Sequence, residues 1–359
     1  AYAGVLVVAV VMALGRWGAG GKGRRGAGER DPRYSSLVTR HSSLAVAGLL
    51  AALSPVLVYY SQETRMYALL ALLAALSAWV LLVWLGGARR PWFWMAAYTL
   101  LLAAGLYTHY FFPAVVAAQG AVVGFWWLLG AGQKGSRGAG GKGSKTLNSR
   151  PVSRISYLVS WVGMAAVATL FYAPWIPIFL RQIGGRGAPA GPATFAVESA
   201  RWLALGSTIS HGEAGWAVLA FVLLILLGVA VGRWRSAVAL LLALIPLVLM
   251  ALVGATDPAF FKFMLAVVPF LAVVAGFAWN YELGDKAFGV RGTGMALWSF
   301  LATGLTVAVL AGSLASLGNL YDDPAYARAD YRRMAARIAA DGHPNAGIIL
   351  VAPNQWEVF

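Results

Sequence analysis

The chain has 359 residues, of which 60% are hydrophobic and only 11% are charged. In soluble domains about a quarter of the residues are charged. Many apolar runs here approach the roughly 20 residues that a helix needs to cross a bilayer. These values exclude a soluble globular protein and predict an all-α polytopic membrane protein. The sequence contains no cysteine, which excludes disulfides and thiolate metal sites.

Apolar runs predict about ten transmembrane helices. In chain order they cover residues 1–15, 44–60, 67–86, 92–109, 112–131, 156–179, 215–231, 236–254, 263–280 and 295–318. The first run opens at Ala1 without an initiator methionine or a signal-peptide pattern. We therefore expect a fragment that has lost sequence at its front and, because it ends abruptly at Phe359, also at its back.

The net charge of +15 would suggest a nucleic-acid partner in a soluble protein, but here much of it lies in loops between spans. Two linkers, 16–43 and 132–155, are rich in Gly, Lys and Arg, and further basic residues follow at 89–90, 233–235 and 286–291. All fall on one side of the ten-span count, and positive loops mark the cytoplasm. We expect a multi-pass protein of the cell (plasma) membrane and no nucleic-acid partner.

The sequence changes character after the last predicted span. Residues 321–340 are charged with helical periodicity, and the run from Gly347 to Pro353 is typical of a buried strand. We expect a transmembrane domain over residues 1–318 and, over 319–359, the start of a small α/β extracytoplasmic C-terminal domain. In the long loop before the seventh span, residues 195–205 could form an amphipathic helix in the membrane interface.

The face opposite the basic loops collects ionisable and aromatic residues. In the stretch from Ser54 to Tyr67, an apolar run ends at Tyr59 and another begins at Met66, with Gln62, Glu63 and Arg65 between them. A charged side chain at a span end costs free energy unless it is paired with an opposite charge, hydrated or needed for function. Such a cluster therefore predicts a functional site. The alternative is a polar turn whose arginine snorkels to the headgroups.

Two pairs of residues could carry chemistry at this face. Glu63 and His109 are separated by two crossings, and a carboxylate with an imidazole could hold a divalent cation or relay a proton. The alternative is an interfacial histidine held by backbone groups within a belt of Tyr and Phe. Arg65 and Lys262 lie at span ends and could bind a lipid phosphate, with snorkelling again as the alternative.

Two of these stretches resemble a known family. The run Ser54-Pro-Val-Leu-Val-Tyr-Tyr-Ser-Gln-Glu-Thr-Arg-Met-Tyr67 and the later Leu106-Tyr-Thr-His-Tyr-Phe111 resemble the multi-pass GT-C glycosyltransferases. The resemblance is to the branch related to aminoarabinose transferases, protein O-mannosyltransferases and rhizobial lipopolysaccharide sugar transferases. Phe260 to Phe270 is similar to that branch's Arg/Lys-aromatic entry to a late span, and Tyr326 to Arg332 to the start of its C-terminal region.

The resemblance implies a glycosyltransferase that moves a hexose or pentose from a polyprenyl-phosphate-linked donor. The acceptor would be a lipid, a glycan or a protein on the extracytoplasmic face. Glu63 and His109 would be the catalytic groups and would hold a divalent metal cation if one is used. The substrate-binding residues would be Arg65, Lys262, Tyr60, Tyr67, Gln62 and Tyr110.

The family's key acidic residue lies in its first extracytoplasmic loop, a segment that would precede Ala1. The resemblance therefore implies that this acid is missing from the given sequence, and a chain truly starting at Ala1 would be a non-catalytic member. A transporter or flippase of lipid-linked or polar solutes is the rival class. It predicts charges at mid-membrane depth and broken helices in matching halves, whereas the ionisable groups here lie at span ends.

Overall fold

The computed structural model describes residues 7–14, 33–63, 65–129, 154–183, 190–209, 211–280, 293–326 and 331–341. Within these ranges the regular structure is entirely helical. Apolar runs of this length form helices because, without water, every backbone donor and acceptor must find its partner within the segment. The prediction of an all-α membrane protein is confirmed to this extent.

Among the described residues, six helical stretches are long and apolar enough to cross a membrane. They are α4 (Tyr67–Leu85), α6 (Phe112–Leu129), residues Ile155–Arg181 of α7 (Arg154–Tyr172) with η2 (Ala173–Trp175) and α8 (Ile176–Ile183), Gly215–Gly232 of α10 (His211–Gly232), α11 (Trp234–Leu252), and Leu297–Asp322 of α14 (Thr293–Asp322). Two bent pairs raise the number to eight: α2 (Arg33–Ala52) with α3 (Pro55–Ser61), bent by 54°, and η3 (Pro258–Ala266) with α12 (Val268–Phe277), bent by 61°.

The described residues thus contain six to eight candidate spans, as in a multi-pass membrane protein, and the expected ten are not all shown. One expected span, 92–109, forms α5 (Pro91–Thr108), whose Trp, Tyr and Thr residues lower its mean hydropathy. Of the first expected span, only residues 7–14 are described, and they are helical. The α2–α3 pair replaces a helix predicted to be continuous over 44–60, because Pro55 begins a new helix after a break at Ser54.

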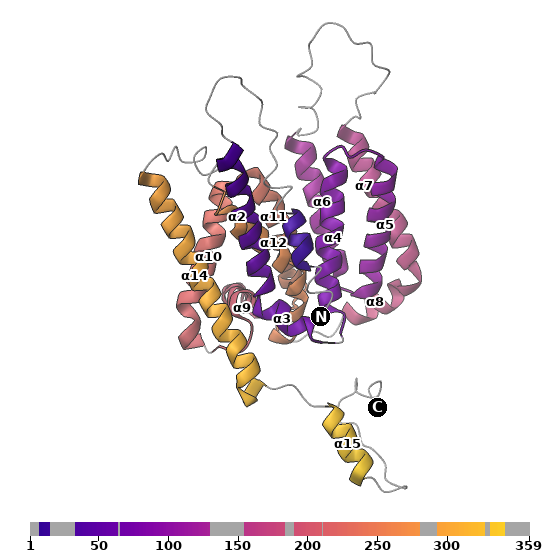
Figure 1. Ribbon diagram of the computed structural model, residues 1–359. Helices are drawn as coiled ribbons and strands as arrows, with labels where there is room; N and C mark the ends of the chain where they lie inside the picture. The colour runs from indigo at the N-terminus through magenta and orange to yellow at the C-terminus, as the bar shows by residue number, and fades with distance from the viewer. Residues whose placement is uncertain are drawn as a thin grey trace.

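Helix α12 lies at the centre of the bundle. All of its residues are buried, and it packs against α2, α10 and α11 (Figure 1). Beside it, α4 packs against α5, α6 and η3. The centre of the molecule is therefore apolar, and ionisable groups are left to the helix ends.

A chain of buried hydrogen bonds ties α4, α5, α6 and α7 together. The Tyr98 hydroxyl donates to Gln119 Oε1 (2.7 Å) and accepts from Trp161 Nε1 (2.9 Å), and Gln119 Nε2 donates to Ser77 Oγ (2.7 Å). Such interhelical bonds stabilise helix association in lipid, where the hydrophobic effect between helices is absent. They fix the relative positions of the helices whose ends carry the candidate site.

Two basic turns lie at one end of the bundle. Arg89 and Arg90 lie in the turn between α4 and α5, and Arg233 in the turn between α10 and α11; both turns are at the upper end in Figure 1. At the lower end lie α3, the start of α4 and the end of α5. Most of linkers 16–43 and 132–155 and the basic positions at 286–291 lie outside the described residues.

Two further expectations concern the lower end. The amphipathic segment 195–205 is helical within α9 (Pro192–Leu205), and its buried Phe195 and Trp202 pack on Phe261 of η3, with ring centroids 6.1 and 6.2 Å apart. Beyond α14, the described part of the predicted helical tail comprises η4 (Pro324–Tyr326) and α15 (Tyr331–Asp341). The strand predicted from Gly347 lies outside the described residues, so the α/β domain is not shown.

Candidate functional site

Tyr67, the first residue of α4, lies at the centre of a cluster of side chains from three distant segments. Its ring is 5% exposed. The ring centroid is 5.4 Å from that of Tyr60 and 5.8 Å from that of His109, and the Lys262 Nζ lies 5.3 Å from it. The structure therefore brings together a tyrosine pair, a histidine and a lysine that the sequence predicted as site residues.

The 3₁₀ helix η3 positions Lys262. Asp257 starts this helix by accepting a hydrogen bond from the Ala259 N–H (2.8 Å). Side chains three residues apart are aligned in a 3₁₀ helix, and Phe260 and Phe263 accordingly pack with ring centroids 5.7 Å apart. The ammonium group of Lys262 contacts the Tyr67 ring through a cation–π interaction. Because Lys262 is only partly buried, a ligand can also reach this group.

Phe263 is a member of the cluster that the sequence analysis did not identify. Its ring centroid lies 4.6 Å from that of His109, 5.2 Å from that of Tyr110 and 6.5 Å from that of Tyr67. The sequence analysis included Phe263 in the family-like stretch from Phe260 to Phe270 but did not assign it to the site, although the three-residue spacing of Phe260 and Phe263 after Pro258 was available in the sequence. Phe263 is the packing partner that holds the histidine and the tyrosines in one place.

His109 lies in the turn between α5 and α6 and is 3% exposed. Its backbone N–H donates to the Gly105 carbonyl (3.1 Å), and its Nδ1 accepts a hydrogen bond from the Phe111 N–H (3.0 Å). Tyr110 stacks on the imidazole with ring centroids 4.4 Å apart. These contacts are those of a histidine held by backbone groups within an aromatic belt, but they account for only one of its two ring nitrogens.

The second nitrogen of His109 has no hydrogen-bond partner in the part of the chain that the structure describes. Nε2 is buried, and no described atom bonds to it. Burial, and to a smaller degree the positive charge of Lys262, lowers the pKa of His109 to about 4. The imidazole is therefore neutral at pH 7.

Glu63 lies in the non-helical connection between α3 and α4 and is half-buried. Its N–H donates to the Tyr60 carbonyl (3.4 Å), and its Oε2 is buried without a hydrogen-bond partner among the described residues. It is therefore not hydrogen-bonded to His109 Nε2, which is likewise buried without a partner among the described residues. A buried acceptor left unsatisfied costs about 1–3 kcal/mol, a cost that a ligand carrying a donor would remove.

Gln62 and Arg65 lie in the connection between α3 and α4, at the rim of the Tyr67 cluster. Both are exposed. The Gln62 Nε2 donates a hydrogen bond to the hydroxyl of Tyr321 at the end of α14, and so joins α3 to α14. No ion pair joins Arg65 to another of the described residues. Arg65 can reach a ligand from outside the cluster, whereas Gln62 has a structural partner.

The described residues do not form a three-ligand site of the kind that holds zinc. No three His, Asp, Glu or Cys side chains gather in the part of the chain that the structure describes. Of the predicted pair, His109 has one nitrogen occupied by the Phe111 N–H and lies close enough to Lys262 to feel its charge. Structural and catalytic zinc sites use at least three protein ligands, so this pair does not make one.

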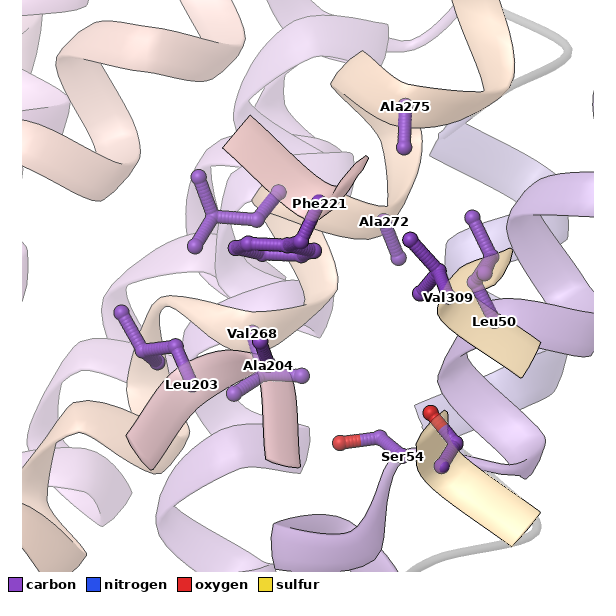
Figure 2. Close-up of a pocket in the computed structure, with 11 residues that line it drawn as sticks. Leu50, Ser54, Leu203, Ala204, Phe221, Val268, Ala272, Ala275 and Val309 are labelled. Atoms are coloured by element: carbon purple, nitrogen blue, oxygen red, sulfur yellow. The ribbon is translucent and has the colours of Figure 1, made fainter. Parts of the chain in front are cut away.

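Two cavities in the described part of the bundle are lined by neither Lys262 nor His109. The larger, of about 250 Å³, is an apolar cavity between α5, α6, α7 and α8. Figure 2 shows the smaller one, at the break between α2 and α3, where Leu50, Phe221 and Val268 surround it and Ser54 lies at its edge. Its volume of about 30 Å³ suits a single water molecule, and Ser54 Oγ is buried without a partner.

Comparison of the chain with protein-family models, with curated proteins and with solved structures finds no match. The functional interpretation therefore rests on the residues and their geometry.

Proposed function

We propose that the chain is a membrane glycosyltransferase that moves a sugar from a polyprenyl-phosphate-linked donor to an acceptor on the extracytoplasmic face of the plasma membrane. The observation that carries this proposal is the convergence on Tyr67 of residues 54–67, 106–111 and 260–263. These are the stretches whose sequences resemble the GT-C enzymes. Their meeting at one end of the bundle, away from the described basic turns, supports a common site.

The reaction needs a group that supports the leaving phosphate. In the transfer, an acceptor hydroxyl attacks the anomeric carbon, the bond from that carbon to the phosphate oxygen breaks, and the lipid phosphate leaves with the electron pair. A fixed cation stabilises the charge that develops on this oxygen. Lys262 is the partly buried cation of the cluster, and the exposed Arg65 can add a bidentate contact from the rim.

The reaction also releases the proton of the acceptor hydroxyl. Glu63 lies four residues before Tyr67, and its buried Oε2 has no hydrogen-bond partner among the described residues. In the proposal it orients the hydroxyl and accepts this proton. Tyr60, Tyr67 and Tyr110 form the aromatic wall against which the sugar and the phosphate would lie.

The position of charged groups favours an enzyme over a transporter. Helices α4, α5, α6 and α12 contain no Asp, Glu, Lys, Arg or His. Ionisable residues in the middle of spans mark ion and substrate pathways, and the described core of this bundle offers none. Glu63, Arg65 and Lys262 instead lie at helix ends, as a site open to the membrane surface requires.

Donor binding tests the role of Lys262. Purified protein in detergent is titrated with farnesyl phosphate, a short polyprenyl phosphate, and the variant Lys262→Met is compared with Lys286→Met, which removes the same charge from a predicted cytoplasmic loop. We expect Lys262→Met to bind at least tenfold more weakly and Lys286→Met to bind like wild type. Equal affinities for both variants would contradict the proposal.

A further inference from the structure

We infer that His109 is a neutral hydrogen-bond donor, through Nε2–H, to the anionic group that Lys262 holds, and that it serves neither as a metal ligand nor as a general base. This inference rests on the proposed function and names the role of one residue in the same site. It replaces the metal-binding and acid–base roles that the sequence predicted for this histidine.

The tautomer follows from the hydrogen bonds of the turn. The Phe111 N–H is a donor, and its bond of 3.0 Å to Nδ1 requires a lone pair on that nitrogen. A neutral imidazole carries one proton, which is thereby assigned to Nε2. The backbone enforces this arrangement, because the His109 carbonyl accepts from the Phe112 N–H (2.9 Å) and so closes the same turn.

This tautomer cannot perform the roles predicted from the sequence. A general base needs a free lone pair, but Nδ1 is already occupied and Nε2 bears the proton. Binding a metal through Nε2 would displace that proton, which would either leave an imidazolate or move to Nδ1 and face the Phe111 N–H in place of the present hydrogen bond. Turning the ring to offer Nδ1 would instead break the bond to Phe111. Each of these changes removes either the proton on Nε2 or the hydrogen bond from the Phe111 N–H to Nδ1. Donation through Nε2–H keeps both.

The surrounding charge also favours an anion. Lys262 lies close enough to lower the pKa of His109, and its ammonium sits over Tyr67, a ring that also contacts the imidazole. A divalent cation at Nε2 would be repelled by this ammonium, whereas an oxyanion would be attracted by it and would accept the Nε2–H bond. The two donors therefore suit one phosphate group.

The burial of Nε2 supplies the reason for a ligand there. A buried N–H without an acceptor costs about 1–3 kcal/mol, and Nε2 has no acceptor among the described residues. Lys262 is partly exposed while Nε2 is not. A phosphate would thus meet the ammonium first and would reach Nε2–H after the adjoining side chains move, as hydrogen bonds at such sites often tighten only on ligand binding.

Nitrogen NMR of a single-histidine protein tests the inference directly. The chain has four histidines, so the triple variant His41→Gln, His211→Gln, His343→Gln leaves His109 alone, and ¹⁵N-labelled histidine then reports on its two nitrogens. We expect a protonated Nε2 and an unprotonated Nδ1 at pH 7. Farnesyl phosphate should shift the Nε2–H signal, and Zn²⁺ at equal concentration should leave it in place.

The contrary outcomes are distinct. A protonated Nδ1, or loss of the Nε2 proton on addition of Zn²⁺, would overturn the inference. Farnesyl phosphate that binds without shifting the Nε2–H signal would overturn it as well, while leaving the proposed function in place. Failure of the wild-type protein to bind farnesyl phosphate at all would remove the proposed function and this inference together. Inorganic phosphate, titrated in parallel, shows whether the headgroup alone suffices.

Two variants separate the donor role from packing. His109→Gln keeps an N–H donor near the position of Nε2, whereas His109→Ala removes it. We expect His109→Gln to bind farnesyl phosphate within about threefold of wild type and His109→Ala to bind about tenfold or more weakly, as for loss of a hydrogen bond to a charged group. Equal affinities for both variants, each with a wild-type melting temperature, would show that His109 does not donate to the ligand.

Discussion

The Lys262 ammonium lies 5.3 Å from the centroid of the Tyr67 ring, and this contact joins the 3₁₀ helix η3 to the first residue of α4. The ring is buried while the lysine is partly exposed. The arrangement holds a cation at the edge of the bundle, where a phosphate group can approach it.

Tyr67 is expected to position Lys262 through its ring and not through its hydroxyl. The variant Tyr67→Phe keeps the ring and should bind farnesyl phosphate like wild type. Tyr67→Leu removes the cation–π contact and should bind roughly two- to tenfold more weakly. Isothermal titration of the two purified variants measures the difference, and equally weak binding by both would assign the role to the hydroxyl instead.

Glu63 is expected to be needed for transfer but not for folding. Glu63→Gln keeps the shape of the side chain and removes its charge, so sugar transfer should be lost while membrane insertion and melting temperature stay unchanged. Glu198→Gln is the matched control, because Glu198 is also half-buried but pairs with Arg201 in α9 (3.1 Å). Transfer at the wild-type rate by Glu63→Gln would remove the role proposed for this carboxylate.

Gly105 is expected to be required by the close packing of α5 on Phe112. A Cβ at this position would lie 2.2 Å from the Phe112 ring, whereas a Cβ at Gly163 would meet nothing within 4 Å. Gly105→Ala should therefore destabilise the protein by about 1–3 kcal/mol, and Gly163→Ala should be neutral or slightly stabilising. Thermal unfolding in detergent compares them, and equal melting temperatures would show that the ring can move aside.

Tyr98 is expected to stabilise the bundle through its hydroxyl. Tyr98→Phe leaves Gln119 Oε1 and Trp161 Nε1 without their partner, and the loss should be about 1 kcal/mol, in the range measured for hydrogen bonds between helices in membranes. The control Tyr107→Phe removes an exposed bond to the Phe171 carbonyl and should cost less. The melting temperature should therefore be lower for Tyr98→Phe than for Tyr107→Phe. The reverse order would contradict this prediction.

Much of the fold could be predicted from apolar run length alone. Spans such as α4, α6 and α11 were expected within a few residues, because a continuous apolar run leaves a helix as the only way to satisfy the backbone in lipid. The break at Ser54 and the 3₁₀ helix over 258–266 were not predicted. Both depend on how a proline-containing segment packs against its neighbours, which run length does not report.

For the candidate site, the sequence predicted only that its residues lie at the same end of the bundle. Counting crossings placed Tyr67, His109 and Lys262 at the same end, and the structure joins them. The state of His109 could not be predicted, because it depends on the extended backbone of this residue, which aims Nδ1 at the Phe111 N–H. The aromatic contacts of Phe263 likewise arise from packing between helices that are distant in sequence.

Sugar transfer by the reconstituted protein tests the central claim most directly. Proteoliposomes containing wild-type protein or Lys262→Met would be supplied with radiolabelled polyprenyl-phosphate hexoses and pentoses and with membrane lipid, glycan and protein acceptors. The account predicts label moving to an acceptor with wild type and at least tenfold less with Lys262→Met. Absence of transfer from every donor, together with movement of the lipid-linked sugar across the bilayer, would contradict it and favour a flippase.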